Sequence, residues 1–122
     1  GRTVHAVVAH LGLIHASRVR QVQRLADFVA AHVPPDDLLV VAGDFNDWGE
    51  KLDAPMAAAC GLRRARGAEA RARPTFPSLA PVFSLDRLYL RGLSCVSTFV
   101  PRSATWARMS DHLPLVAELV AD

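Results

Sequence analysis

Runs of apolar residues alternate with polar segments along this chain, and their spacing predicts a mixture of strands and helices. Leu38 to Ala42 is a continuous apolar run rich in valine, which is typical of a buried strand. Apolar residues starting at Val22 recur at i, i+3, i+4 and i+7, which predicts one apolar stripe along a helix. The pattern predicts strands over residues 3–9, 38–42, 84–90, 93–100 and 113–120, and helices over residues 18–32 and 54–60.

Polar and proline-containing segments set the predicted ends of these elements. Ser17 is expected to cap the long helix at its N-terminus, and Pro34-Pro35 ends that helix. Gly61 is expected to end the short helix in a left-handed conformation. The arginine-rich segment from Leu62 to Arg73 has no clear period, so we expect it to be irregular. The strand–helix–strand order near the start predicts a βαβ-like unit, and residues 1–122 are expected to form a single domain.

The composition is that of a folded domain with a modest core. Hydrophobic residues make up 51% of the 122 residues, a share typical of a folded chain and not of a disordered one. No apolar run approaches the roughly 20 residues needed to span a bilayer, and Gly1 to His5 lacks the apolar region of a signal peptide. We therefore expect a cytoplasmic protein. Because there is no initiator methionine and a strand starts almost at once, we also expect a piece of a longer protein.

Charge and cysteine content restrict the function only a little. The formal net charge is +2, and Lys51 is the only lysine among 14 cationic residues. Arginine binds phosphate in a bidentate manner, but a genome-wide bias toward Arg and Ala explains the same composition. Cys60 and Cys95 allow one disulfide at most, and we expect two free, buried thiols.

Polar side chains occur at the ends or starts of four predicted strands, where a sheet brings distant residues together. Ligand sites of open sheets lie at the carboxyl ends of strands, and strand alternation predicts that Asp44 and Asn46 point to the same side. A simple turn is the alternative interpretation of these two residues. Two carboxylates with a histidine–carboxylate pair are the groups that metal-assisted hydrolysis of a phosphate ester requires. The candidates are His10, Asp44, Asn46, Asp47, Asp86, Asp111 and His112.

Four short motifs lie in a fixed order along the chain: His10-Leu11, Gly43-Asp44-Phe45-Asn46, Leu85-Asp86-Arg87-Leu88-Tyr89 and Ser110-Asp111-His112. Together they resemble the endonuclease/exonuclease/phosphatase superfamily, and Thr75-Phe76-Pro77 resembles a bacterial subgroup of it. The resemblance implies an α/β (α+β) fold, with one sheet plus helices forming half of a DNase-I-like four-layer α/β/β/α sandwich. It also implies a metal-dependent phosphoesterase in the intact parent.

The resemblance implies a role for each matching residue. Asp44 would position or activate the attacking water, and Asn46 would hold the scissile phosphate. His112 would contact the phosphate while Asp86 orients its ring. His10 would contact the phosphate from the other side.

The metal site that the resemblance implies is incomplete in this chain. Asp111 and Asp44 are the expected ligands of Mg²⁺ or Mn²⁺. The family's principal glutamate ligand has no match, because Glu50, Glu69 and Glu118 are the only glutamates and none lies in a corresponding context. We therefore expect a carboxyl-terminal half that binds the metal weakly and has little or no activity on its own.

The expected partners follow from the same resemblance. Half a sandwich leaves an apolar sheet face uncovered, which predicts a homodimer through that face or association with the missing half. The substrate would be a phosphate ester in nucleic acid or in a phospholipid or inositol-phosphate head group. The arginines from Arg63 to Arg73 could grip a polyanion, and a solvated loop is the alternative interpretation of this segment. No amphipathic membrane helix is found that would support a lipid substrate. Asp47, Trp48, Trp106 and Arg108 either line the site or simply pack. A non-catalytic binding or interaction module that retained the fold is the alternative function.

Overall fold

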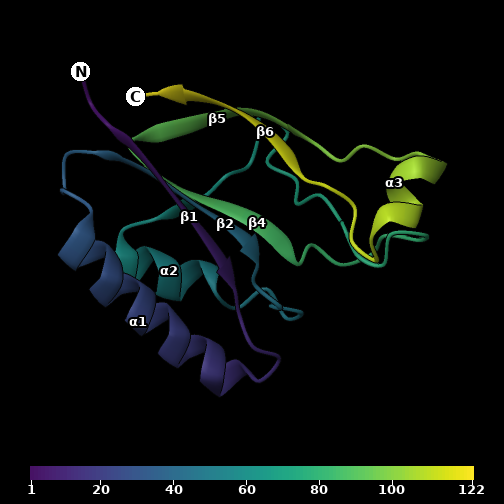
Figure 1. Cartoon of the computed structure of the whole chain (residues 1–122), viewed down its shortest axis with the longest axis horizontal. Coiled ribbons are helices and arrows are strands. Elements are labelled where there is room, and N and C mark those ends of the chain that lie inside the picture. The colour runs from purple at the N-terminus through teal and green to yellow at the C-terminus, as the bar shows by residue number, and fades with distance from the viewer.

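The computed structural model describes all 122 residues and contains three helices and six strands (Figure 1). The mixed α/β class predicted from the sequence is confirmed. The helices are α1 (His15–His32), α2 (Asp53–Cys60) and α3 (Ala104–Met109). The strands are β1 (Val4–His10), β2 (Leu38–Asp44), β3 (Arg63–Arg64), β4 (Asp86–Arg91), β5 (Leu93–Phe99) and β6 (Val116–Ala121).

The strands divide between two sheets rather than the single sheet expected from the sequence. One sheet has the order β1-β2-β4-β3, in which β1 runs parallel to β2 and β4 runs antiparallel to both β2 and β3. The other sheet is the antiparallel pair β5–β6. Gly92 has a positive φ of 71° between β4 and β5, so the chain turns away from the first sheet at this residue.

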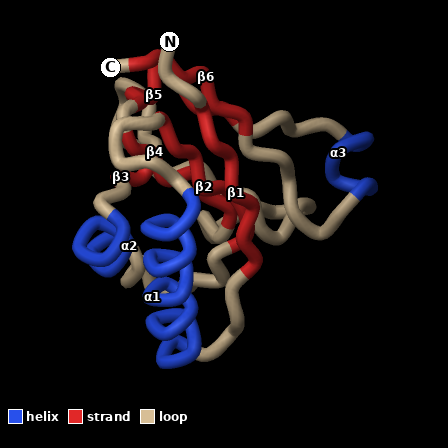
Figure 2. The backbone as a smooth tube through the Cα atoms, turned by 60° about the vertical axis from the view of Figure 1, so that its left-hand side comes forward, coloured by secondary structure: helices blue, strands red, loops and turns tan.

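The main core lies between one face of the larger sheet and the helices α1 and α2, which cover that face (Figure 2). The α1 stripe predicted from the sequence contributes Val22 and Val29, and α2 contributes Met56. These side chains pack with Leu39 and Val41, which alternate along β2. Gly61 ends α2 with a φ of 65°, as predicted.

The opposite face of the sheet is only partly covered. Leu38 and Leu90 form a small cluster there with Leu93 of β5. On β1, Val8 is 86% exposed and Val4 is also exposed. The expectation of an uncovered apolar sheet face therefore holds for the β1 side of the sheet.

Helix α1 begins three residues earlier than the sequence predicted. Ser17 lies inside its first turn, and the residue at the cap position is Ile14, which makes no side-chain capping bond. The turn is held from outside the helix, because the Arg18 guanidinium donates to the carbonyl of Leu13 at 2.6 Å. The carboxamide of Gln21 accepts from the amide of Gly12 at 2.9 Å. Long-range side-chain bonds thus replace the local cap.

Most other elements end within two residues of the prediction, and the larger differences concern α3, the arginine-rich segment and β6. Helix α3 was not predicted, because six residues are too short for an apolar period, although Ser103 accepts from the Trp106 amide as an N-cap. Part of the arginine-rich segment pairs with β4 as β3, so it is not wholly irregular. Strand β6 begins at Val116 because the amide of Leu113 donates instead to the carbonyl of Thr75, and Pro114 has no amide to donate.

Both cysteines are free, as predicted, but they are half-buried rather than buried. Burial raises the pKa of the Cys60 and Cys95 thiols. None of the three helices has both the length and the apolar character needed to cross a bilayer.

Gly43 is a position at which only glycine fits. Its φ is +146°, and a Cβ atom there would lie 1.8 Å from the carbonyl oxygen of Ala9 on β1. We expect Gly43→Ala to lower the free energy of unfolding by at least about 1–3 kcal/mol, measured by urea denaturation. Gly12→Ala is the matched control, because its nearest neighbour would lie 3.6 Å away. Equal stability of the two variants would show that β1 and β2 do not approach this closely.

Candidate functional site

Strand pairing brings three polar side chains into one row across the sheet. His10 is the register partner of Asp44 on β2, and Asp44 is the register partner of Asp86 on β4. Paired residues of neighbouring strands point to the same face. Since Leu39, Val41 and Tyr89 face the helices, the three polar side chains lie on the opposite face.

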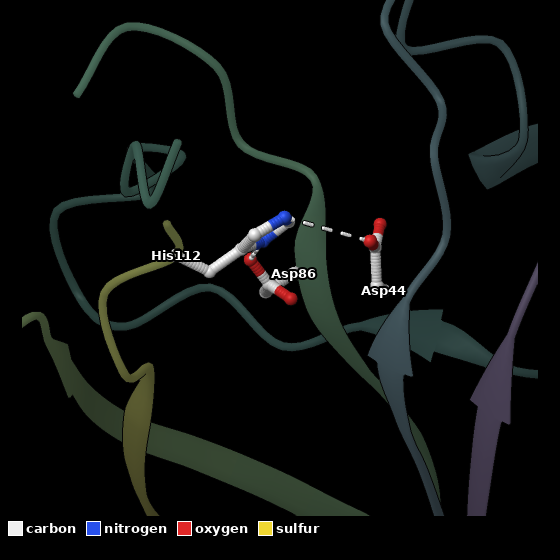
Figure 3. A group of neighbouring side chains, drawn as sticks. All are labelled: Asp44, Asp86 and His112. Carbon is white, nitrogen blue, oxygen red and sulfur yellow. Dashed lines mark hydrogen bonds and ion pairs between the residues drawn. The ribbon is translucent and has the colours of Figure 1, made fainter. Parts of the chain in front are cut away.

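His112 completes this row from a distant part of the chain, the loop between α3 and β6 (Figure 3). Its Nδ1 lies 2.6 Å from Oδ2 of Asp86, and its Nε2 lies 3.7 Å from Oδ2 of Asp44. The backbone amide of His112 donates to the Ser110 hydroxyl at 3.1 Å. The imidazole therefore lies between two carboxylates, in the arrangement predicted for His112 and Asp86.

Thr75 is a residue of this site that the sequence analysis did not assign. Its hydroxyl donates to Oδ2 of Asp86 at 2.5 Å, so this carboxylate oxygen has both Thr75 and His112 as partners. Thr75 is itself fully buried, and its backbone bonds to Phe83 and Leu113. Its place in the Thr75-Phe76-Pro77 motif was the only signal in the sequence.

The surroundings of His112 favour its protonated form. Desolvation by burial lowers the pKa of His112, but the hydrogen bond to Asp86 and the charges of Asp86, Asp44 and Asp111 together raise it above the ordinary value. A raised pKa increases the share of His112 that is protonated, and the protonated ring can donate to an anionic ligand.

The donor set fits a divalent cation held mainly by Asp44. One nitrogen or oxygen from each of Asp44, Asp86 and His112 lies within 4.8 Å of the others. However, Oδ2 of Asp86 already accepts from Thr75 and bonds to Nδ1 of His112, so neither of these two atoms is free for a metal. Oδ2 of Asp44 has only looser neighbours, the Nε2 atoms of His10 at 3.6 Å and His112 at 3.7 Å. Mg²⁺ commonly takes one or two carboxylates and keeps several waters, which suits this arrangement.

The other sequence candidates lie nearby in different environments. His10 has a side chain that is 76% exposed, beside Asp44. Asp111 is exposed next to His112 and lies outside the group of three, so its role as a metal ligand stays a prediction.

Asn46 is buried, and the alternation argument does not extend to it. Strand β2 ends at Asp44, and Asn46 has a positive φ of 47°. Its amide N–H donates to Oδ1 of Asp44 at 2.9 Å, and its Nδ2 donates to the carbonyl of Leu11 at 2.7 Å. The turn described by the alternative interpretation is therefore present, and it fixes the carboxylate of Asp44.

Asp47 does not line the site, because its side chain is fully buried on the helix side of the sheet. Its Oδ2 accepts from Arg87 Nη1 at 2.7 Å and from the amide of Leu52 at 2.8 Å. Arg87 Nη2 also donates to the Asp47 carbonyl at 3.0 Å. Burial raises the pKa of Asp47, but these bonds and one from the Lys51 amide together lower it. The pair ties the loop after Asp44 to the strand that carries Asp86.

The arginine-rich segment is largely occupied by pairs within the chain. Arg64 pairs with Glu50 at 2.9 Å, and Arg66 pairs with Asp53 at 3.2 Å. Arg73 pairs with Glu69 at 2.9 Å. Most arginines of this segment are therefore already paired within the chain. Few free cations remain to bind the expected polyanion.

The sequence matches an established family over most of its length. The profile of the Endonuclease/Exonuclease/phosphatase family matches residues 2–112. YbhP of Escherichia coli strain K12, an uncharacterized protein, is 39% identical over 123 residues, which cover 98% of this chain and 47% of YbhP. The chain therefore spans about half the length of the curated relatives it matches.

Solved structures of other proteins share the fold. TDP2 from D. rerio, solved in complex with a single-strand DNA product, is 16% identical with a TM-score of 0.72, covering 97% of this chain and 56% of TDP2. The mannosyl-6-phosphatase of Bacteroides thetaiotaomicron is 18% identical with a TM-score of 0.67, covering 93% of this chain and 49% of that protein. At such identities the similarity establishes the fold alone.

We expect Asp86→Asn to lower the pKa of His112, because the main stabilising partner of the imidazolium is lost while burial remains. The ring signals of His112 in an NMR pH titration measure this pKa. The raised folded-state pKa also adds stability that is complete below the unfolded-state value of about 6.5 and is lost as pH rises through the folded-state pKa. Asp111→Asn is the control, because Asp111 makes no hydrogen bond to the ring and its effect is smaller. An unchanged pKa in Asp86→Asn would refute the assigned pair.

We expect Arg87→Met to lower the free energy of unfolding by about 3–5 kcal/mol, because it leaves the Asp47 carboxylate buried and unpaired. Combining it with Asp47→Asn should cost less than the sum of the two single variants, as chemical denaturation would measure. Arg73→Met is the control, since a partly exposed pair contributes about 0–1 kcal/mol. Additive losses would show that Arg87 and Asp47 act independently.

Proposed function

The chain belongs to the endonuclease/exonuclease/phosphatase family, and from this premise we propose that it forms the histidine-bearing half of a metal-dependent phosphoesterase. The observation that carries the proposal is the position of His112 between the carboxylates of Asp86 and Asp44. The family name covers hydrolysis of both phosphodiesters and phosphomonoesters. TDP2 was solved with a single-strand DNA product, which matches the phosphodiester class. The name of the mannosyl-6-phosphatase matches the phosphomonoester class.

His112 stabilises the charge that develops on the phosphoryl group. Its Nδ1 bonds to Asp86, which leaves the Nε2 side of the ring for a ligand near Asp44. A protonated imidazole donates a hydrogen bond to a phosphoryl oxygen, and the bond strengthens as negative charge builds there. Asp86, held by Thr75, keeps the ring in place. His10, on the other side of Asp44, is a second exposed donor for the same phosphate.

Asp44 orients the attacking water. Its Oδ1 is fixed by the Asn46 amide, and its Oδ2 faces the two histidines. A carboxylate in this position accepts a proton from water as the water attacks phosphorus. Asn46 fixes Asp44 through its backbone amide, and its side-chain amide would hold the phosphate only by giving up its bond to the Leu11 carbonyl.

A divalent cation, Mg²⁺ or Mn²⁺, would supply charge neutralisation on the phosphate, with Asp44 and Asp111 as its ligands from this chain. The carboxylates of Asp44 and Asp111 alone supply too few ligands to enclose a cation. The proposal therefore includes weak metal binding in this chain alone, with further ligands supplied by the rest of a longer protein.

The exposed apolar face of β1 is the surface that such a remainder would cover. Val4 and Val8 point to solvent on the same side as His10. A bare apolar face is a typical mark of an interface. Since the curated relatives are about twice as long as this chain, we propose that their other half lies on this face, and a second copy of the chain is the competing occupant.

A chimera tests both parts of the proposal. In it, this chain replaces the matching 123-residue stretch of YbhP, which is 39% identical. We expect the chimera to hydrolyse bis-p-nitrophenyl phosphate or p-nitrophenyl phosphate with Mg²⁺, and the 122-residue chain alone to hydrolyse neither. Asp44→Ala in the chimera should lower the rate by about 10²–10⁴-fold, because the group that orients water is lost.

Controls separate the chemistry from the assembly. Phe28→Glu, on the solvent side of α1, should leave the rate unchanged, whereas Val8→Glu on the sheet face should impair assembly. A folded chimera that hydrolyses no phosphate ester with any divalent metal would rule out the phosphoesterase. Full activity of the isolated chain would rule out the need for another half, and light scattering would reveal a functional homodimer.

A further inference from the structure

Large apolar side chains are exposed on the segments that flank His112, where nothing in this chain covers them. Leu79 is 84% exposed, and the others range from about two-fifths to about two-thirds exposed. Isolated exposed apolar residues are ordinary, but a group beside a reactive site indicates a contact surface. The group, which we call the apolar rim, consists of Trp48, Leu79, Val82, Phe83, Trp106 and Met109.

The rim is continuous with the candidate site. The ring of Phe76 lies 4.9 Å from the His112 ring and 5.5 Å from the ring of Trp48, measured between centroids. Trp48 in turn lies 4.6 Å from Phe83. Aromatic contacts therefore lead directly from His112 to the rim.

The two rim segments far apart in sequence are joined at Ser78. Its hydroxyl donates to the Ala107 carbonyl of α3 at 3.1 Å, and its amide donates to the Asp111 carbonyl at 2.7 Å. The loop that carries Leu79 and Val82 is thus bonded both to α3 and to the segment that carries His112. Figure 1 shows this loop and α3 side by side, away from α1 and α2.

The backbone beneath the rim is held by many bonds. Trp48 follows Asp47, which is anchored by Arg87. The Thr75 amide donates to the Phe83 carbonyl at 2.9 Å, and the Val82 amide donates to the Phe76 carbonyl at 2.9 Å. The apolar side chains are therefore presented outward by a fixed scaffold, which favours binding without a large ordering cost.

Within the two longer rim segments the only charged side chains are cationic, and the exposed acids Glu50 and Asp111 lie at their margins. Residues 74–85 contain no charged side chain, and residues 99–110 contain Arg102 and Arg108 but no acidic residue. Both arginines are exposed, and neither forms an ion pair or hydrogen bond within the chain. Protruding aliphatic tips with flanking cations complement an anionic lipid surface, where tryptophan also partitions well. The rim also holds three aromatic side chains, which can stack on nucleobases, so single-stranded nucleic acid is the competing ligand that the test below includes.

We propose that the apolar rim binds the surface of an anionic phospholipid membrane and presents a head-group phosphate to His112. The identity of the substrate as a phospholipid rests on the proposed phosphoesterase function, whereas binding to the membrane does not. Leu79, Val82 and Met109 enter the head-group region, and Arg102 and Arg108 contact lipid phosphates. The protein lies on the surface and does not span the bilayer.

Sedimentation with phosphatidylcholine vesicles, with and without phosphatidylglycerol, tests the binding on the 122-residue chain. We expect binding to the anionic vesicles with a blue shift of tryptophan emission. Combining Leu79→Ser with Val82→Ser should lower the partition coefficient by about tenfold or more, since apolar area no longer leaves water. Combining Arg102→Gln with Arg108→Gln should lower it by a similar factor on anionic vesicles and abolish its dependence on salt.

Two control variants of comparable exposure identify the surface that binds. Leu13→Ser lies before α1 and should leave the binding unchanged, and Val8→Ser tests the uncovered sheet face. If Val8→Ser removes the binding and the rim variants do not, the proposal is overturned. It is equally overturned if the chain does not bind vesicles. The same holds if the rim variants lose binding to single-stranded DNA and keep their binding to vesicles.

The activity of the YbhP chimera separates this inference from the proposed function. Hydrolysis of a soluble phosphate ester without vesicle binding would refute the rim and leave the phosphoesterase standing. Rim-dependent vesicle binding by a chimera that hydrolyses no ester would support the membrane surface and refute the phosphoesterase. Faster hydrolysis of vesicle phospholipid, lost in the rim variants while the rate on p-nitrophenyl phosphate stays unchanged, would support both.

Discussion

The lateral pairing of β1, β2 and β4 is the constraint on which the site depends. It fixes His10, Asp44 and Asp86 as successive neighbours across three strands, at the spacing that backbone hydrogen bonding imposes. Gly43 permits this pairing, because any side chain there would collide with β1 one residue before Asp44. His112 is the one member of the site that strand pairing does not position. Its contacts with Asp44 and Asp86 define where its ring lies.

The helix side of the sheet supports the same geometry through a polar pair. Arg87 and Asp47 are both buried and join the strand of Asp86 to the loop after Asp44. A buried ion pair is not by itself a stabilising choice, since apolar residues of similar volume would often serve as well. Its contribution here is positional, because hydrogen bonds of defined direction hold the loop more narrowly than apolar packing does. Tyr89 and Asp53 extend the network to the start of α2.

The sequence predicted the parts of this arrangement that depend on local pattern. The buried run of β2, the apolar stripe of α1 and the left-handed Gly61 were all found, and Asp86 does partner His112. Whatever depends on contacts between distant residues was missed. The cap of α1 uses Arg18 and Gln21 rather than Ser17. Asp47 faces inward because Arg87, forty residues away, lies beneath it.

Adjacent residues on β4 have opposite surroundings, and this protects the alignment of the sheet. Asp86 points toward the histidines, while the next residue, Arg87, points into the core on the other face. A slip of β4 by a single residue would exchange them, burying an acid beside Asp47 and placing a guanidinium against His112. On the core face two acids would then meet without a cation, which is the costly part of the slip. The buried, unpaired acids thus disfavour a misaligned sheet that the apolar residues of β4 would tolerate, because Leu88, Tyr89 and Leu90 follow one another and are all at least half-buried.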